Sequence, residues 1–470
     1  MRKFVALEKE LNLFSHSYDG FFYWQQLRFT VCEALFGNRI ANENAASEKN
    51  KKPVLKKIAR YACSVADALR VEWRLLKGTK SELIFLREPL SSDKFLDSWE
   101  LPAEISRADY RCVPYFKGRK AGELFLENAR IQSVIEKRLR KVLRMELSDS
   151  NEKRFLKMLE NRLKNDFGQT LSADKMETLI RDLYIWDKNY SRLFSRIFRR
   201  SGCRAIAFIN YYSTELISAL KAAEKNNVTS IELQHGVINN HEEYWFEDNR
   251  GLHNYVPDCL LTFGEIHNSW IKPVRGKKAE AVGFPFQEKS LKALSNVLPD
   301  EKAIMIYPES DPGFEKLLNE FIDRITPLGY HVYIKLHPLH SENASLWYPL
   351  LSNNKNAELI IDQSKGIYYW LKTAKHHIMA STTVGLEAVA MDHPNVCIAL
   401  TVPHDQVQCL IDWNIARGFS SAEELIRLVL EPLDMNNSQA MAARKRLWKD
   451  NGSENMTAFF RRLKKNGWRI

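Results

Sequence analysis

Polar residues that can do acid–base chemistry follow directly on short apolar runs in this chain. The first example is ELQHG at 232–236, which ends the strand-like run VTSIELQ. Substrates of α/β proteins bind at the carboxyl ends of strands, and a histidine titrates near neutral pH. His235 is therefore a candidate general base. The alternative is a plain turn, in which Gly236 supplies a permissive backbone and His235 points at water.

A second group of this kind, KLHP at 335–338, ends another strand-like run. Pro338 cannot donate a hydrogen bond to a sheet, so His337 would be held at the rim of that sheet. Lys335 precedes the pair in the same strand. These residues are candidates for binding an anionic group at the strand end.

Three hydroxyl side chains, Ser381, Thr382 and Thr383, open a helix in the segment ASTTVGLEA. Hydroxyls, free backbone N–H groups and the positive end of a helix dipole together favour an anion such as phosphate. The alternative is ordinary N-capping, which these residue types perform in many helices. Glu387 lies further into the same helix. It could accept hydrogen bonds from ribose hydroxyls, or it could be an exposed helix carboxylate.

The segment IYPESDPG at 306–313 places Glu309 and Asp311 at a further strand end. A turn of this composition needs no function, and its position beside a strand end is the only feature that favours one. Magnesium can use one or two such carboxylates together with substrate phosphates, but a single pair is a weak signal. We expect no metal, and we expect His337, Lys335 and helix dipoles to neutralise phosphate charge.

The elements that carry these motifs alternate between strand and helix. Runs such as AIAF, CLLTF, AIMIY and NVCIAL read as buried strands, and capped helical segments such as STELISALKAAEKNN lie between them. This alternation predicts βαβ units and parallel sheets. Two series of units meet near 283–285, so we expect two doubly wound α/β domains with a ligand between the carboxyl ends of their sheets.

The expected organisation has four parts. Residues 1–80 are a helical and basic segment, and 81–284 are a Rossmann-like domain with a helical insertion on the acceptor side. Residues 285–435 are a second Rossmann-like domain that binds the donor nucleotide, and 436–470 are a basic carboxyl-terminal helix. A length of 470 residues agrees with more than one hydrophobic core.

Composition excludes several classes of protein. Hydrophobic residues make up 45% and charged residues 27%, which is typical of a globular chain. Seven scattered cysteines without a CxxC pair argue for reduced thiols and against a zinc site. No GxxxxGK[ST] or GxGxxG motif is present, which disfavours ATPases and dinucleotide enzymes. Charged residues at 8–10 interrupt the apolar core that a signal peptide needs, so we expect a cytoplasmic protein.

The net charge of +11 comes largely from three basic clusters, at 49–80, 192–204 and 461–470. The first and last mix cations with bulky apolar residues, as helices on a membrane surface do. Solvated helix faces are the alternative. We expect peripheral contact with an anionic membrane, and no nucleic acid, because zinc-finger spacings and RRM-like aromatic motifs are missing.

Taken in order, these motifs resemble the GT-B glycosyltransferases. The resemblance is carried by VGFP at the domain junction, KLHP at a strand end and STTVGLEA at a helix start, and it covers roughly residues 205–400. The His–Pro pair with a downstream hydroxyl cluster is similar to bacterial transferases that use CMP-activated sugars, the sialyltransferases and Kdo transferases. CDP-glycerol transferases carry a similar pair. ELQHGVI followed by HEEYW is similar to capsule and lipopolysaccharide export-linked proteins.

The resemblance implies roles for individual residues. His235 would act as base on an acceptor hydroxyl, with Glu243 and Glu232 as weaker candidates for base or nucleophile, and Gln234 and Gly236 would lie near the sugar. The donor nucleotide would be bound by a larger set: His337, Pro338, Lys335, Ser381, Thr382, Thr383, Glu387 and Glu309. The acceptor-base motif D/E-D/E-G is not matched, because Tyr244 follows Glu242–Glu243. The base and the stereochemical outcome therefore stay open.

The sequence thus predicts a metal-independent glycosyltransferase at the cytoplasmic face of the inner membrane. It would move a Kdo- or sialic-acid-like sugar from a CMP donor to a polysaccharide or glycolipid acceptor. Alternatives of the same fold are a CDP-glycerol or CDP-ribitol transferase and a UDP-sugar epimerase. An alternative of another class is a non-catalytic adaptor that binds glycan or membrane through its basic faces.

Overall fold

The computed structural model describes a large part of the chain, and all statements below refer to that part. It comprises residues 2–36, 80–87, 98–99, 101–111, 124–125, 150–168, 171–209, 211, 213–234, 236, 254–270, 278–308, 312–336, 351, 354–361, 364–380, 382–391, 395–402, 407–433 and 438–470.

Seven parallel strands form the sheet of the first domain, in the order β5-β4-β3-β6-β7-β8-β9. They are β3 (Leu83–Arg87), β4 (Arg107–Arg111), β5 (Leu124–Phe125), β6 (Ala205–Phe208), β7 (Thr229–Leu233), β8 (Cys259–Thr262) and β9 (Lys278–Ala281). The central strands are buried on both faces, which explains their nearly continuous apolar runs. The helices of this domain are α8 (Ala173–Ser201), α9 (Thr214–Lys225) and α11 (Glu265–Trp270).

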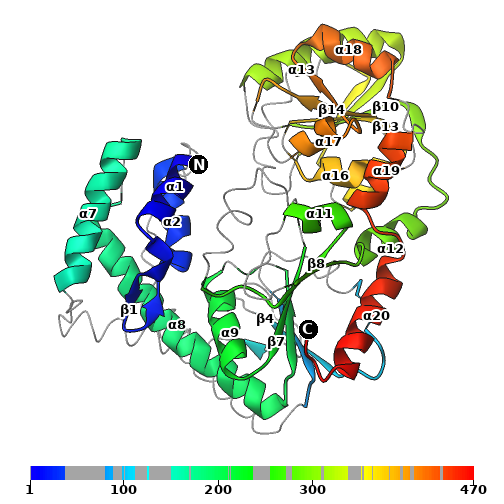
Figure 1. Cartoon of the computed structure of the whole chain (residues 1–470). Coiled ribbons are helices and arrows are strands. Elements are labelled where there is room, and N and C mark those ends of the chain that lie inside the picture. The colour runs from blue at the N-terminus through cyan, green and yellow to red at the C-terminus, as the bar shows by residue number, and fades with distance from the viewer. Residues whose placement is uncertain are drawn as a thin grey trace, which may run out of the picture.

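Six parallel strands form the sheet of the second domain, in the order β12-β11-β10-β13-β14-β15. They are β10 (Asp300–Tyr307), β11 (His331–Lys335), β12 (Ala357–Ile360), β13 (Ala374–Met379), β14 (Asn395–Ala399) and β15 (Arg417–Phe419). The helical elements are α12 (Pro285–Ala293), α13 (Pro312–Ile325), η2 (Thr326–Leu328), α15 (Ile367–Thr373), α16 (Val384–Ala388), α17 (Gln408–Asp412) and α18 (Ala422–Leu430). Figure 1 shows the two sheets in separate domains, one above the other, with helices around each.

Side chains of neighbouring strand residues enter different cores. In the first sheet, Ile84 and Ile206 pack with α8 and α9, whereas Phe85 and Ala207 point to the opposite face. In the second sheet, α13 and α18 cover one face. The remaining faces of both sheets contribute to one continuous cluster, which therefore links the two domains.

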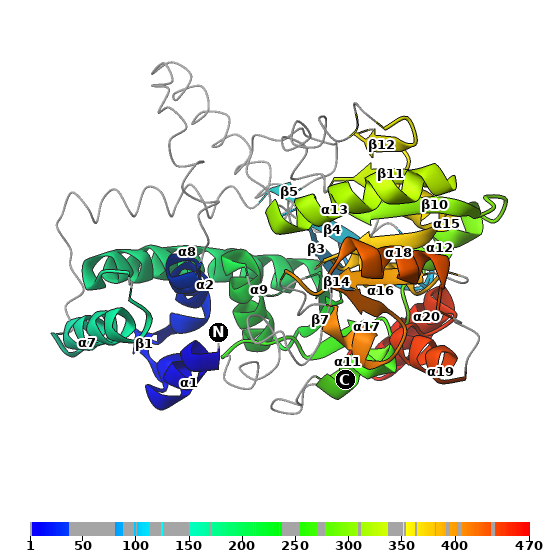
Figure 2. The ribbon, with the colours of Figure 1, turned by 90° about the horizontal axis from the view of Figure 1, so that it is seen from above.

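A separate group of helices extends from the first domain, and we call it the N-terminal helical unit. It contains α1 (Arg2–Glu10), η1 (Leu13–Ser15), β1 (Ser17–Tyr18), β2 (Phe21–Phe22), α2 (Trp24–Phe36), α7 (Ser150–Phe167) and the first half of α8. Both ribbon views place this unit at one end of the molecule, away from the carboxyl-terminal helices (Figures 1 and 2). Residues before 37 therefore share a core with the helical insertion.

The chain crosses between the domains twice, at 282–285 and at 447–452. Gly283 has φ +89°, and a side chain there would collide with the Lys449 carbonyl oxygen and approach Gly452 Cα to 2.9 Å. Only glycine fits this close approach of the two crossings. After α19 (Ser438–Leu447), α20 (Gly452–Lys465) returns to the first domain.

The basic tail is bound to the protein itself. Phe460, Leu463 and Trp468 are buried in the continuous core, while Arg462 pairs with Glu280 and Lys464 pairs with Glu82. The apolar face of α20 is thus not available to a bilayer, which corrects the expectation of a membrane-lying helix at 461–470. The other expected membrane segment, 49–80, lies outside the described residues except for its last one.

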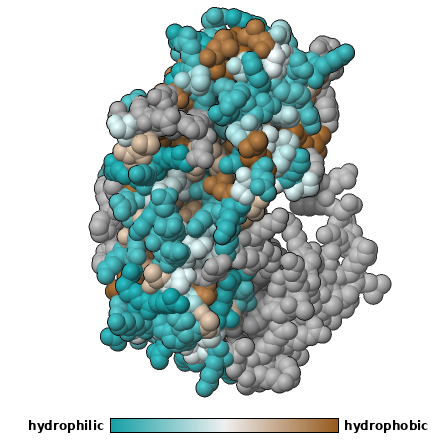
Figure 3. Space-filling view, turned by 90° about the vertical axis from the view of Figure 1, so that its right-hand side faces the viewer, coloured by the Kyte–Doolittle hydropathy of each residue, from teal (hydrophilic) through white to brown (hydrophobic). Residues whose placement is uncertain are grey.

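Neither a membrane-spanning helix nor an extended hydrophobic patch on the face in Figure 3 is found among the described residues. Among the described residues, no helix is long and apolar enough to cross a membrane. The face that carries α12 and α20 is mostly hydrophilic, and its hydrophobic residues stand in separate small groups (Figure 3).

Candidate functional site

The loop after β7 and the loop after β13 meet at the boundary between the domains. A Cβ atom placed on Gly236 would lie 3.8 Å from Cγ2 of Thr383. These residues belong to the ELQHG and ASTTVGLEA motifs, which are almost 150 positions apart. The carboxyl ends of strands from both sheets therefore face each other, which is where α/β proteins bind ligands.

The Gln234 side chain holds the loop after β7 in place. Its Nε2 donates to the Gly236 carbonyl oxygen at 2.8 Å, and its Oε1 accepts from the Phe263 backbone N–H at 2.8 Å. Only 2% of Gln234 is exposed, so this amide positions the loop from within. Glu232, expected as a weaker candidate for base or nucleophile, lies inside β7 with an exposed fraction of 1%.

The hydroxyls that precede α16 have different tasks. Thr382 Oγ1 accepts from the Val384 backbone N–H at 3.4 Å, a long capping contact. Thr383 occupies the N-cap position without a side-chain capping bond, so its hydroxyl is not used for capping. Since α16 has only five residues, its dipole supports an anion less than a long helix would.

Glu387 follows these hydroxyls in α16, and its largely buried environment favours the neutral carboxyl group. Its side chain is largely covered, with limited solvent contact. Burial raises the pKa of Glu387 to about 7, and the nearby Tyr368 hydroxyl opposes part of this shift. A group with this pKa can gain or lose a proton under physiological conditions. Glu387 is thus not the ordinary exposed helix carboxylate considered above.

Two tyrosines lie close to Glu387. Tyr307 is the last residue of β10 and Tyr368 lies in α15, and burial, with the Glu387 carboxyl adding to it, raises the pKa of each phenol well above its ordinary value. Both stay neutral hydroxyls at any physiological pH. Sequence reasoning missed both, because a tyrosine at a strand end or in an aromatic helix is usually part of a core.

His377 lies beneath this group in β13. Its Nδ1 is 3.5 Å from the Tyr307 hydroxyl, and the two rings are stacked. Burial and the neighbouring His376 lower the pKa of His377 to about 3, so the ring stays neutral. His377 can hold a hydroxyl in place but cannot supply positive charge.

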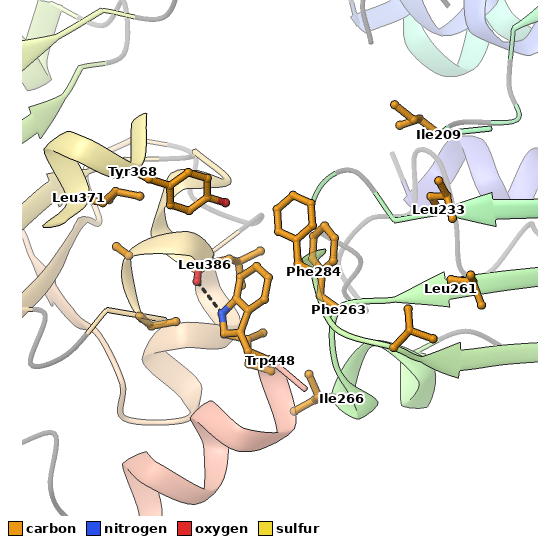
Figure 4. Packing of buried hydrophobic residues seen from close by; sticks show 14 of the residues in the cluster. Ile209, Leu233, Leu261, Phe263, Ile266, Phe284, Tyr368, Leu371, Leu386 and Trp448 are labelled. Atoms are coloured by element: carbon orange, nitrogen blue, oxygen red, sulfur yellow. Dashed lines mark hydrogen bonds between the residues drawn. The ribbon is translucent and has the colours of Figure 1, made fainter. Parts of the chain in front are cut away.

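Aromatic stacking closes the boundary between the domains. Phe263, which follows β8, stacks on Phe284 at 4.3 Å and on Trp448 at 5.0 Å between ring centroids. The Trp448 indole N–H donates to the Leu386 carbonyl oxygen at 2.9 Å. Figure 4 shows this hydrogen bond, with the Tyr368 hydroxyl directed toward Phe284. The helix that carries Glu387 is therefore attached to the second crossing.

The structure describes part of the predicted site. Lys335 is the last residue of β11 and is 7% exposed. Among the described residues, no group of three or more His, Cys, Asp or Glu side chains could hold a metal ion. The other predicted site residues lie outside the described part of the chain: His235, Glu243, His337, Pro338, Ser381 and Glu309.

Comparisons with solved structures identify the fold. UDP-GlcNAc 2-epimerase from Methanocaldococcus jannaschii is similar with a TM-score of 0.50 and 11% identity, over 82% of this chain and 99% of that chain. UDP-GlcNAc 2-epimerase from Neisseria meningitidis bound to UDP-GlcNAc has a TM-score of 0.49 and 12% identity, over 82% of this chain and 100% of that chain. MurG from Acinetobacter baumannii has a TM-score of 0.42 and 11% identity, over 81% of this chain and 99% of that chain.

No protein-family model matches the sequence, and no curated protein does. At 11% identity, the likeness to the first structure defines the fold alone. Together with the two parallel sheets, it confirms the expected GT-B architecture of two Rossmann-like domains.

Proposed function

We propose that this protein is an enzyme that acts on a nucleotide-activated sugar bound between its two domains. The main observation in support is the close approach of Gly236 to Thr383, which brings together two strand-end motifs from different sheets. The second domain contributes the Thr383 hydroxyl, which is not used for capping, and the Glu387 carboxyl group, whose pKa is raised to about 7. Such convergent polar groups beside an apolar boundary are typical of a ligand site.

The second domain would bind the nucleotide. Thr383 would donate to a phosphate oxygen, together with Ser381, His337 and Lys335. Glu387 would bind the ribose hydroxyls. The loop after β7 would face the sugar, where His235 acts as base and Gln234 keeps the backbone of Gly236 in place.

A UDP-sugar is the first substrate to consider. The similar protein from M. jannaschii is a UDP-GlcNAc 2-epimerase, and this likeness supports a UDP-sugar epimerase as the leading reaction. Epimerisation needs no acceptor, so it can be measured on the protein and the nucleotide sugar alone.

The second candidate is the transfer of a Kdo- or sialic-acid-like sugar from a CMP donor to a glycan or glycolipid at the membrane. The order of KLHP and STTVGLEA in the sequence favours it. Neither candidate requires a metal ion in our proposal. The nucleotide that binds distinguishes them.

The test is thermal unfolding in the presence of UDP, UDP-GlcNAc, CMP, CDP, or no ligand. A ligand at about one hundred times its dissociation constant adds about 2.7 kcal/mol of stability, which raises the melting temperature measurably. We expect UDP and UDP-GlcNAc to protect, and UDP-GlcNAc to be converted without acceptor. Protection by CMP alone would select the transferase, and no protection by any nucleotide would refute both.

Variants at the two motifs add a structural test. Thr383→Val removes a hydroxyl at constant volume and should weaken nucleotide binding about tenfold or more, as expected for a lost hydrogen bond to a charged group. The matched control is Thr373→Val, whose hydroxyl is bonded within α15 to the Tyr369 carbonyl oxygen. Equal nucleotide affinities of the two variants would contradict the assignment of Thr383.

A further inference from the structure

A cavity lies beside the two crossings between the domains, and we call it the crossover cavity. Its volume is about 610 Å³, which is within the range of small-molecule sites. Its walls come from α12, from α19 and from the segment that leads into α20. An occupant would therefore touch both places where the chain passes between the domains.

Part of the wall is apolar. Phe284 and Trp448 are stacked, and both line the cavity together with Leu291 and Met441. The Met441 side chain is 46% exposed. Aromatic and aliphatic side chains of this kind bind the apolar body of a ligand.

A buried amide also faces the cavity. Gln287 lines it and is 6% exposed, and its Nε2 has no hydrogen-bond partner among the described residues. The Gln287 side chain is near enough to the buried Tyr368 hydroxyl to influence its pKa, yet the two groups do not meet hydrogen-bond geometry. An unpaired buried donor is unfavourable, so an acceptor from a ligand would stabilise this site.

The charges around the cavity favour an anion. Arg444, Lys445 and Lys449 line it, against the carboxylates of Glu288 and Asp450. Glu288 already accepts from the Ser453 backbone N–H at the start of α20. Lys445 is exposed and has no ion-pair or hydrogen-bond partner in the part of the chain that the structure describes.

We propose that the crossover cavity binds a small organic anion. Its oxyanion would accept from Gln287 and pair with Lys445, and its apolar part would lie against Trp448 and Leu291. The carrier of the oxyanion is a phosphate or a carboxylate. The site is separate from the proposed nucleotide site, so either proposal can fail without the other.

The position of the cavity gives its occupant a way to act on the nucleotide site. Trp448 lines the cavity and donates to the Leu386 carbonyl oxygen, next to Glu387. A ligand that binds better to one arrangement of the crossings would shift the equilibrium between arrangements. Nucleotide binding and cavity binding would then affect each other equally.

The experiment uses the full chain and the fluorescent probe 8-anilinonaphthalene-1-sulfonate, which combines flat rings with an oxyanion. We expect saturable binding that Lys445→Glu weakens about tenfold. The control Arg446→Glu makes the same charge change on the adjacent exposed residue, which does not line the cavity, and it should leave the affinity within about twofold.

A second pair of variants tests whether the probe binds in the crossover cavity, by filling the cavity with a larger side chain. Leu291→Trp fills the cavity and should abolish probe binding, while Leu298→Trp, at a position 82% exposed, should not. Equal affinities within either pair would overturn the proposal. A probe affinity that falls in proportion to the UDP concentration, without reaching a plateau, would also overturn it, because the two molecules would then compete for one site, whereas coupling between two sites reaches a limit.

Competition identifies the oxyanion. Displacement by inorganic phosphate indicates a phosphorylated ligand, and displacement by succinate indicates a carboxylate. If neither displaces the probe, the cavity does not recognise oxyanions and the proposal is wrong.

Discussion

Glu387 and His377 have opposite effects on how stability depends on pH. The pKa of Glu387 rises from 4.5 to about 7 on folding, chiefly through burial, so folding favours its protonated form. Its contribution is present at low pH and is lost as the pH rises toward 7. Burial lowers the pKa of His377 from 6.5 to about 3, so its contribution is present above pH 6.5 and is lost as the pH falls.

Glu387→Gln isolates the first of these effects. The variant keeps the shape of the side chain but cannot ionise. We expect the free energy of unfolding of the natural protein, relative to the variant, to fall by about 2 kcal/mol between pH 5 and pH 8, after allowance for the partial exposure of Glu387. The measurement is urea unfolding of both proteins at several pH values.

A control for this prediction is Glu431→Gln at an exposed position after α18. Its stability difference from the natural protein should not change with pH. If the Glu387 variant behaves in the same way, the carboxyl group is ionised in the folded protein and our account of its burial is wrong.

At the scale of elements, a buried ion pair joins the first two helices of the N-terminal helical unit. Arg28 Nε donates to Glu8 Oε1 at 2.7 Å, and the Trp24 indole N–H donates to the same oxygen at 2.8 Å. Glu8 is fully buried and Arg28 is 5% exposed. Removing one partner of such a pair leaves a buried charge uncompensated.

We expect Arg28→Met to lower the free energy of unfolding of the protein by about 3–5 kcal/mol. The double variant Glu8→Gln with Arg28→Met should lose less than the sum of the two single variants, because no unpaired charge remains. Chemical unfolding of the four proteins measures the coupling between the two residues.

The exposed pair of Arg324 with Glu423 serves for comparison. Its side chains are 42% and 75% exposed, so Arg324→Met should cost much less stability than Arg28→Met. A similar loss for Arg28 and Arg324 would mean that the buried pair is open to water in solution.

At the scale of the whole molecule, one continuous apolar core joins the two sheets. Trp448 connects the two domains, since its ring stacks on Phe263 of the first domain and its indole N–H donates to the Leu386 carbonyl oxygen in α16 of the second. We therefore expect the two domains to unfold together.

Calorimetry can test this coupling. We expect one unfolding transition for the natural protein and two for Trp448→Ala. The substitution removes the stacking and leaves a cavity, which should lower the free energy of unfolding by about 3–5 kcal/mol. Trp448→Phe keeps an aromatic ring and should retain a single transition, with a loss of about 1 kcal/mol for the hydrogen bond. Two transitions in the natural protein would show that the shared core does not couple the domains.

The sequence by itself determined the fold class and most of the central strands, but not the peripheral strands β4, β5, β9 and β15. Strand segments such as 303–307 and 396–399 are continuous apolar runs because parallel strands are buried on both faces. The helix caps Ser172 and Ser213 accept from backbone N–H groups three residues on, as short-range patterns predict. The positions of the motifs at strand ends followed from the same local signals.

Only the tertiary structure decided which of these local features meet. Residues far apart in the chain produce the approach of Gly236 to Thr383, the raised pKa of Glu387 and the return of α20 to the first domain. A basic, amphipathic tail has the same local pattern whether its apolar face meets a membrane or the protein. Burial depends on what packs against a residue, and neighbours in the sequence do not contain that information.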